Sequence, residues 1–202
     1  MRNVQKLELL FSKFPGIGRR QAKRFVYFLL SQNELFVDDL ISELQSSKRE
    51  NTKCSLCNRF FENINPEIES CKICAIPERN NGKLLIVNSE SDFENIEKTG
   101  HFKGRYFLIG QNLKILEKKP EEKISLNSLL NNIEQNRINE LIFALSVNPE
   151  GENTKKWMTD YLADHQNRLN FTVSELGRGL SMGSELEYSD ESTIAAALEN
   201  RK

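Results

Sequence analysis

Short apolar runs alternate with amphipathic stretches from residue 83 onward. The apolar runs are bounded by polar positions and predict four buried strands, at residues 84–87, 106–109, 141–145 and 171–173. The stretches between them predict helices, at residues 92–98, 126–135 and 152–167. Short apolar strands separated by helices favour a parallel sheet that is covered on both faces. The pattern therefore predicts an α/β domain here and an α+β chain overall.

Sheets of this kind bind ligands beyond the carboxyl ends of their strands. In this sequence those positions are residues 88–89, the turn at Gly110 and residues 146–152. Glu150 and Glu152 fall in the last segment, and two glutamates on one short turn can attract a cation or a partner. They are equally the acids that the dipole favours at the start of a helix.

The first 52 residues have the period of helices. Apolar side chains recur at helical spacing up to Pro15, at Val4, Leu7, Leu10, Phe11 and Phe14. A second helix has one apolar face, made of Ala22, Phe25, Val26 and Leu29. A third helix at residues 37–48 is expected to turn four apolar side chains inward, Val37, Leu40, Ile41 and Leu44. The pattern predicts a helix-hairpin-helix within a small helical bundle.

The turn between the first two helices offers a place for a phosphate. Gly16 and Gly18 let the backbone turn tightly and approach another chain closely, and the second helix then begins with free N–H groups. Four basic side chains lie in its first two turns: Arg19, Arg20, Lys23 and Arg24. We interpret this segment as a DNA contact. The alternative is a plain helical bundle whose basic face lies in solvent.

All four cysteines of the chain occur in two Cys-x-x-Cys pairs: Cys54, Cys57, Cys71 and Cys74. Two such turns place four thiolates at the corners of a tetrahedron, the geometry that Zn²⁺ takes. Because four cysteines leave no open position for water, we expect a structural ion. Iron, two disulfides and a redox pair are the alternatives. Phe60 and Phe61, between the pairs, are expected to pack this module against its neighbours, with base stacking as the alternative.

Charge and hydropathy limit the partners. The 202 residues have a net charge of −1, so contact with nucleic acid requires basic residues that are gathered locally. With 38% hydrophobic and 28% charged residues, the composition is that of a globular protein. The longest apolar runs are far too short to cross a bilayer. The first ten residues mix charged and apolar side chains, unlike a signal peptide. We therefore expect a cytoplasmic protein without a membrane segment.

In this order, the segments resemble the RecR family of bacterial recombination mediators over essentially the whole chain. The most specific matches are residues 14–18, the cysteine quartet, residues 99–107, residues 150–152, and a tail with Gly179, Gly183 and residues 185–188. The resemblance divides the chain into four parts. They are a helix-hairpin-helix domain (1–52), a four-cysteine zinc finger (53–78), a Toprim-like domain (79–174) and a C-terminal glycine-rich loop with a final helix (175–202).

The resemblance implies a non-enzymatic protein that helps to load the RecA recombinase onto gapped DNA. It also implies that the chain works with RecO or RecF and assembles into a ring-like homotetramer. Arg20 and Arg24 fall where the family has Lys and Arg after the hairpin, so they are the first candidates for sequence-independent contact with DNA.

A catalytic Toprim site needs a Glu after the first strand and an Asp-x-Asp pair after the third, which together hold Mg²⁺. This sequence has Asn88 at the first position, where the RecR family usually keeps Glu, and Ser146 and Asn148 at the other two. The missing acids argue against the first alternative function, a Toprim nuclease or primase-like enzyme. The second alternative is a zinc-stabilised protein–protein adaptor with little affinity for DNA.

Overall fold

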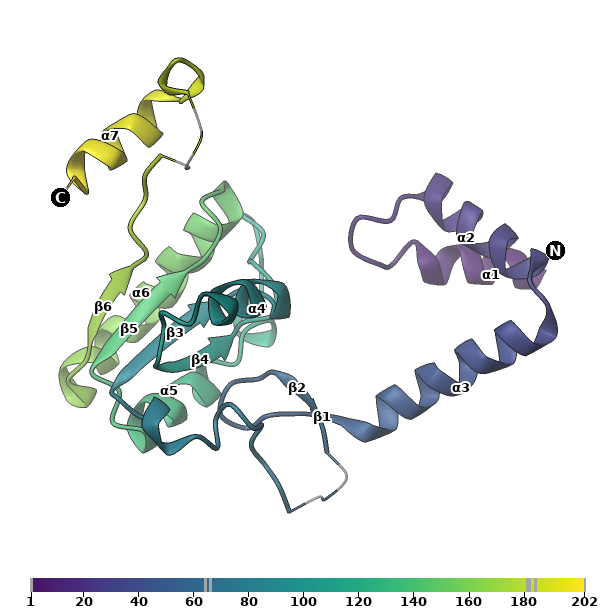
Figure 1. Cartoon of the computed structure of the whole chain (residues 1–202), viewed down its shortest axis with the longest axis horizontal. Coiled ribbons are helices and arrows are strands. Elements are labelled where there is room, and N and C mark those ends of the chain that lie inside the picture. Colours follow the sequence, from purple (N-terminus) through teal and green to yellow (C-terminus); the bar gives the residue numbers. More distant parts are fainter. Residues whose placement is uncertain (1, 64, 66, 181–182, 184, 202) are drawn as a thin grey trace. The chain divides into compact units, whose positions relative to one another are not determined.

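The chain forms two compact units in a computed structural model that describes residues 2–63, 65, 67–180, 183 and 185–201. Unit 1 spans Met1–Thr52 and unit 2 spans Lys53–Lys202 (Figure 1). Unit 1 is helical, whereas unit 2 contains the cysteine segment, a mixed α/β domain and the C-terminal segment. The α+β class predicted from the sequence is confirmed.

Three helices make up unit 1: α1 (Arg2–Phe11), α2 (Arg19–Ser31) and α3 (Glu34–Glu50). α1 and α2 pack against each other, and the ring centroid of Phe11 lies 5.7 Å from that of Phe25. The chain reverses in a tight turn, where the Ile17 N–H donates to the Phe14 carbonyl at 3.1 Å. Gly16 has φ +74 in this turn, a backbone conformation that glycine adopts without strain. The two helices and the turn that the sequence predicts are present.

The inward face predicted for α3 is wrong. Leu40, Ile41 and Leu44 are 36%, 48% and 63% exposed. Neither α1 nor α3 has a buried residue among those described. α3 contacts α2 near its start, where the ring centroids of Phe36 and Phe28 are 6.0 Å apart. A helical period marks an apolar face but does not say what covers it, and in one chain of this protein that face of α3 is open.

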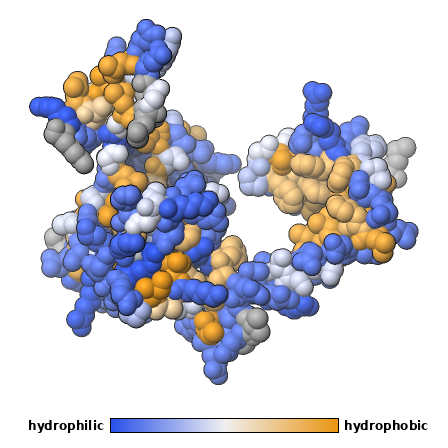
Figure 2. Space-filling model, in the orientation of Figure 1, coloured by the Kyte–Doolittle hydropathy of each residue, from blue (hydrophilic) through white to orange (hydrophobic). Residues whose placement is uncertain are grey.

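Unit 1 consequently buries little. The buried side chains of α2 are Ala22 and Val26. Large apolar side chains remain exposed on all three helices, and Figure 2 shows them gathered on the surface of unit 1. A groove of about 510 Å³ runs among them. Its lining is almost entirely apolar and consists of Phe11, Phe14, Pro15, Ile17, Phe25, Phe28, Leu29, Phe36 and Leu40.

A four-stranded parallel sheet forms the centre of unit 2. Its strands are β3 (Lys83–Val87), β4 (Arg105–Leu108), β5 (Glu140–Ala144) and β6 (Thr172–Glu175), in the order β4-β3-β5-β6. In the register, Leu85 lies opposite Tyr106 on one side and Ile142 on the other. Each strand lies within two residues of its predicted place, because buried parallel strands have little but apolar side chains and are easily recognised.

Helices cover both faces of this sheet (Figure 1). Leu84, Ile86 and Phe107 point toward α5 (Leu126–Gln135) and α6 (Pro149–Leu169), where they form the larger core. Leu85 and Tyr106 point to the other face and pack with α4 (Glu90–Thr99) in the smaller core. Successive side chains of these strands point to opposite faces of the sheet and so contribute to two separate cores, as expected for a parallel sheet.

Short elements complete unit 2. The cysteine segment holds the two-stranded sheet of β1 (Asn51–Lys53) and β2 (Phe60–Glu62), which the sequence pattern did not reveal, and a 3₁₀ turn η1 (Pro77–Arg79). Further 3₁₀ turns, η2 (Pro120–Glu122) and η3 (Leu186–Tyr188), precede α5 and α7 (Glu191–Glu199). None of the helices within the described residues combines the length and the hydropathy that a membrane crossing requires.

Candidate nucleic-acid interface and metal centre

The start of α2 is an uncapped helix terminus. Gly18 is its N-cap residue and has no side chain to accept from the first N–H groups, and the first turn contains no acidic residue. The amide groups at this end are therefore open to an external acceptor, and the positive end of the helix dipole is not compensated by a nearby acid. An anion such as a phosphate fits this position.

The four predicted basic side chains surround this terminus. All are exposed: Arg19, Arg20, Lys23 and Arg24. Arg20 and Arg24 lie on the side of the helix opposite the buried pair. Within the described part of the chain none of the four forms an ion pair with a carboxylate. Arg24 Nη1 approaches Gln21 Oε1 at 3.4 Å, and Lys23 Nζ lies 5.7 Å from the Tyr27 ring centroid. Their charge is therefore available to a ligand.

The four cysteines come together in unit 2 as predicted. Their exposed fractions are between 0% and 5%, and their sulfurs all lie within 4.8 Å of one another. Cys54, Cys57, Cys71 and Cys74 are all free thiols, so the disulfide alternative does not hold in this structure. Among the described residues they are the one set of three or more ligand-type side chains close enough to share an ion.

The spacing of the sulfurs fits a tetrahedral metal. Cys57 Sγ and Cys71 Sγ are 3.7 Å apart. This agrees with a tetrahedral zinc site, in which Zn–S bonds of about 2.3 Å place neighbouring sulfurs about 3.8 Å apart. The Cys71 N–H donates to Cys54 Sγ at 3.3 Å, as expected for backbone donors around a thiolate. A hydrogen bond from Cys57 lowers the pKa of Cys54, and the same contact raises the pKa of Cys57. A cation would relieve this competition by stabilising every sulfur as thiolate.

The cysteine segment is attached to the edge strand β4 through its backbone. The Leu108 N–H donates to the Cys57 carbonyl at 2.9 Å, and Asn58 Nδ2 donates to the Leu108 carbonyl at 3.3 Å. Arg105, which is 8% exposed, donates from Nη1 to the Cys74 carbonyl at 3.1 Å. The metal site is therefore continuous with the sheet, and Arg105 holds it there.

A second attachment runs through Glu90 at the start of α4. One carboxylate oxygen accepts from Arg59 Nε at 2.7 Å and the other from the Phe60 N–H at 3.1 Å. The Arg59 guanidinium also lies 3.5 Å from the centroid of the Phe93 ring. These contacts fix the backbone of β2 to the α/β domain. No sequence signal predicts them, because Arg59 and Glu90 are far apart along the chain.

One of the three catalytic positions of a Toprim site has a structural role here. Asn148 is the N-cap of α6, and its Oδ1 accepts from the Gly151 N–H at 2.8 Å. A Cβ at Gly151 would lie 1.9 Å from the Ser146 carbonyl oxygen, so this turn requires glycine. Asn88 follows β3, and its Oδ1 is buried without a hydrogen-bond partner among the described residues. None of these side chains supplies a carboxylate for Mg²⁺.

Glu150 and Glu152 lie in the first turn of α6, where the helix dipole favours acids. Glu150 is exposed, whereas Glu152 belongs to a closed ring of alternating charges at the end of the sheet. Lys155 Nζ lies 2.8 Å from Glu152 Oε2 and 2.6 Å from Glu175 Oε2. Arg178 Nη2 lies 2.5 Å from Glu152 Oε1 and 3.4 Å from Glu175 Oε2. The two predicted glutamates therefore have different surroundings, since no ion pair within the described residues joins Glu150 to this ring.

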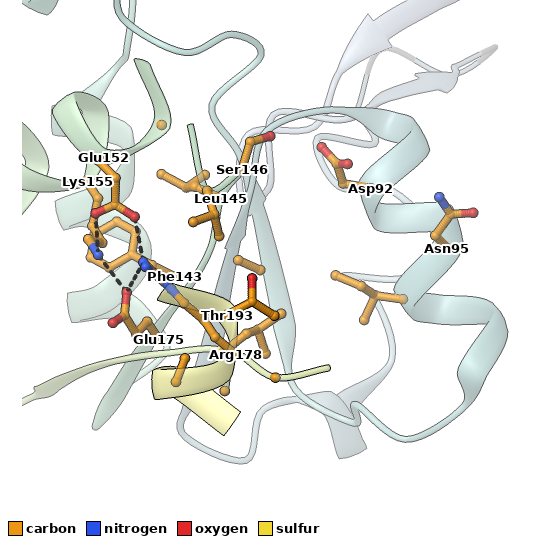
Figure 3. A pocket seen from close by; sticks show the side chains of 18 residues that line it. Asp92, Asn95, Phe143, Leu145, Ser146, Glu152, Lys155, Glu175, Arg178 and Thr193 are labelled. Carbon is orange, nitrogen blue, oxygen red and sulfur yellow. Dashed lines mark hydrogen bonds and ion pairs between the residues drawn. The ribbon is translucent and has the colours of Figure 1, made fainter. Parts of the chain in front are cut away.

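Figure 3 shows this ring on one side of a cleft of about 580 Å³, with Asp92 and Asn95 of α4 on the other side. The Lys155 ammonium lowers the pKa of Glu152 and of Glu175. Burial acts to lower the pKa of Lys155, but its two carboxylate partners raise it. The cations of the ring are already paired within the chain. One contact of the ring could have been inferred from the sequence, because Glu152 and Lys155 are three residues apart on a helix and such side chains are neighbours.

Comparisons with known proteins agree with this architecture. Residues 82–173 match the family model of the Toprim domain, and residues 179–202 match the model of the RecR C-terminal region. The first match covers the whole parallel sheet apart from the last residues of β6. The second covers the tail after the ion-pair ring.

Full-length relatives also match. "Recombination protein RecR" from Rickettsia canadensis (strain McKiel) is 33% identical over 201 residues, which is 99% of this chain and 96% of that protein. The protein of the same name from Rickettsia bellii (strain OSU 85-389) is 34% identical over 200 residues, 98% and 95% of the two chains. That of Tropheryma whipplei (strain Twist) is 33% identical over 202 residues, 100% and 98% of the two chains.

Proposed function

The chain belongs to the RecR family of recombination proteins, and we propose that it acts in recombinational DNA repair as a mediator that binds DNA without catalysing a reaction on it. The observation that carries the DNA contact is the uncapped start of α2 with four exposed basic side chains around it. Phosphates meet both the open amide groups and the guanidinium groups there.

The absence of catalysis is supported by the site itself. Magnesium-dependent phosphoryl transfer requires carboxylates that converge on the ion. In this chain Asn148 is used to cap a helix, and Glu152 is held by two cations. The family resemblance adds the working context: RecO and/or RecF as protein partners, RecA as the recombinase that is loaded onto gapped DNA, and the cytoplasm as the compartment that holds the chromosome.

Zinc is the ion that we propose for the four cysteines. Four thiolates at tetrahedral spacing and without an open position are the ligand set of structural zinc. When bound, the ion supplies a crosslink between the two Cys-x-x-Cys turns. The cysteine carbonyls then hold β4, through the Leu108 N–H and the Arg105 guanidinium.

Self-association to a tetramer completes the proposal. The groove of unit 1 is lined by apolar side chains, and contiguous exposed apolar patches mark interaction surfaces. A ring of several chains would also let a protein of net charge −1 hold DNA, because the basic residues of each chain then face one enclosed duplex.

The test is the double variant Arg20→Ala/Arg24→Ala. Contacts to phosphate give a slope of log affinity against log salt of about 0.9 per phosphate neutralised on duplex DNA. The variant should lower this slope by about 2 per chain engaged, and should weaken binding to all sequences alike. Fluorescence anisotropy with gapped duplexes of two unrelated sequences measures both effects.

The matched control is Lys118→Ala/Lys123→Ala, which removes two exposed charges from unit 2. It should leave the slope close to that of the parent. Unchanged binding by the arginine variant across the whole salt range would show that the hairpin is not the DNA site.

A further inference from the structure

Phe60 is an exposed aromatic side chain on the edge of the cysteine segment. It is 54% exposed, although it follows directly on residues that are anchored to the α/β domain. Its neighbour Phe61 points the other way and packs, half-buried, against the cysteine cluster. The prediction that both rings pack the module therefore holds for Phe61 alone. The exposure of Phe60 has no explanation in the packing of this chain.

The backbone that carries Phe60 is held in place. Its N–H donates to Glu90 at 3.1 Å, and the same carboxylate fixes the preceding Arg59, whose guanidinium lies against the Phe93 ring. The Arg59 carbonyl accepts from the Cys54 N–H at 2.8 Å. A ring on so fixed a backbone loses little conformational freedom when a ligand covers it.

A cation stands beside the ring. Lys53 Nζ, on the neighbouring strand β1, lies 5.3 Å from the Phe60 ring centroid. Lys53 is exposed, and no carboxylate pairs with it within the residues that the structure describes. Its charge is therefore free to meet an anion next to whatever covers the ring.

From these contacts we propose that Phe60 and Lys53 form a stacking site for one unpaired base of single-stranded DNA, with the ammonium meeting the neighbouring phosphate. A nucleotide has a flat π-face, which can stack on the Phe60 ring, and a negatively charged phosphate, which can meet the Lys53 ammonium. A fully paired duplex keeps its bases stacked inside the helix, so the site distinguishes single strands. The exposed carboxylate of Glu62, two residues along β2, discourages a longer phosphate track, which limits the site to a single base.

This inference rests on the proposed DNA binding and adds a second kind of contact to it. The α2 hairpin reads phosphates, which single and double strands share. The stacking site at Phe60 binds only an unpaired base, and it accepts any base because each has a π-face. A mediator that acts at gaps needs such a distinction between the two forms of DNA.

The experiment compares two single strands of equal length, oligothymidine and an oligomer of abasic deoxyribose phosphates, by fluorescence anisotropy. Phe60→Leu keeps the apolar bulk but removes the π-face. We expect it to weaken oligothymidine binding about fivefold to a hundredfold, the range that alanine substitution gives for one stacked base. Binding of the abasic strand should be unchanged. Phe60→Tyr should keep the affinity of the parent for both strands.

Three further variants separate the explanations. Tyr188→Leu removes an exposed ring from another part of unit 2, where 80% of the side chain is open, and should bind like the parent. Lys53→Gln should weaken both strands, because both carry phosphates. Arg20→Ala/Arg24→Ala should do the same more strongly. Metal content and circular dichroism confirm that each variant is folded.

Equal oligothymidine binding by Phe60→Leu and the parent overturns the stacking site. An equal loss on the abasic strand also overturns it, since no base is then involved. A changed oligomer mass with unchanged DNA binding would assign Phe60 to a protein contact instead. A parent that binds neither strand refutes the proposed function itself, whereas a normal arginine effect beside a neutral Phe60→Leu refutes only this inference.

Discussion

Units 1 and 2 treat their apolar side chains in opposite ways. In unit 2 the strands β3 and β4 are buried on both faces, and one hydrophobic core lies on each side of the sheet. In unit 1, helices α1 and α3 have no buried residue among those described, and an apolar groove stays open. Both units have the amphipathic sequences of folded domains, so the pattern of apolar positions does not indicate which unit buries its apolar side chains.

The two units therefore differ in how much of their apolar surface they bury within one chain. Unit 2 buries its sheet by itself, and its four cysteines are close enough together to hold an ion. Unit 1 exposes large apolar side chains, which in water is unfavourable by about 25 cal/mol for each Å² left uncovered. The proposed assembly would therefore stabilise unit 1 by covering these side chains, whereas unit 2 buries its sheet within one chain.

The largest expected effect is that of Cys57→Ser on unit 2. Structural zinc supplies roughly 10–16 kcal/mol to small metal modules, which exceeds the whole stability of many domains. Because the Cys57 carbonyl accepts from Leu108 on β4, loss of the ion should also loosen the edge of the sheet. We expect the variant to hold no stoichiometric zinc and to unfold at much lower denaturant than the parent.

Elemental analysis measures the zinc, and the fluorescence of Trp157 reports unit 2, because the single tryptophan of the chain packs against its larger core. Ser55→Ala is the control within the same turn, since Ser55 hydrogen-bonds Glu69 and carries no sulfur. One ion per chain and unchanged unfolding in Cys57→Ser would contradict a four-thiolate site.

An intermediate effect is expected when a core side chain and a groove side chain are shortened in turn. Leu129 is 0% exposed in the larger core of unit 2, and Phe28 is 52% exposed on the groove of unit 1. Leu129→Ala should lower the free energy of unfolding of unit 2 by about 2–5 kcal/mol. Phe28→Ala should leave that value unchanged and lower the mass of the assembly at micromolar concentration.

Trp157 fluorescence in denaturant gives the first quantity and light scattering the second. If Phe28→Ala keeps the full mass, the groove is not an interface. If Leu129→Ala lowers the mass as much as it lowers stability, the two units are not separable in the way that their burial indicates.

The same comparison explains how far the sequence could predict the structure. The strands of unit 2 were located within two residues, because apolar runs such as Leu84 to Val87 belong in the interior of a globular domain. The cysteine cluster was predicted in full, since ligand spacing is local. The exposure of α3 was not, because what covers an apolar face is a property of other chains or distant segments.

Contacts between distant residues were also beyond the sequence. Arg59 with Glu90, and Arg178 with Glu152, join segments that are adjacent only after the sheet has formed. The hairpin arginines were identified as candidates by their type and position, yet the absent cap at Gly18 became visible only in the backbone. Local chemistry was thus predictable, and pairings that depend on topology were not.

The smallest expected effect concerns the ring of Glu152, Lys155, Glu175 and Arg178, which ties the tail to the end of the sheet. The pKa values of both glutamates are lowered from 4.5 in the folded protein by Lys155. A carboxyl group with a lowered pKa contributes stability above its unfolded value and loses it as pH falls through the folded value. The contribution of the ring should therefore be full at pH 7 and fade below about pH 4.5.

Arg178→Gln breaks the ring without shortening the side chain much, and solvent exposure limits its cost to about 0.2–1 kcal/mol at neutral pH. The control Lys103→Gln removes one exposed positive charge that has no ion pair within the described residues. Calorimetry of the three proteins at about pH 7 and about pH 3.5 should show the Arg178 difference shrinking in acid, while the Lys103 difference stays small at both. A difference that grows in acid would mean that Arg178 stabilises the tail through something other than the two carboxylates, such as its packing along the cleft.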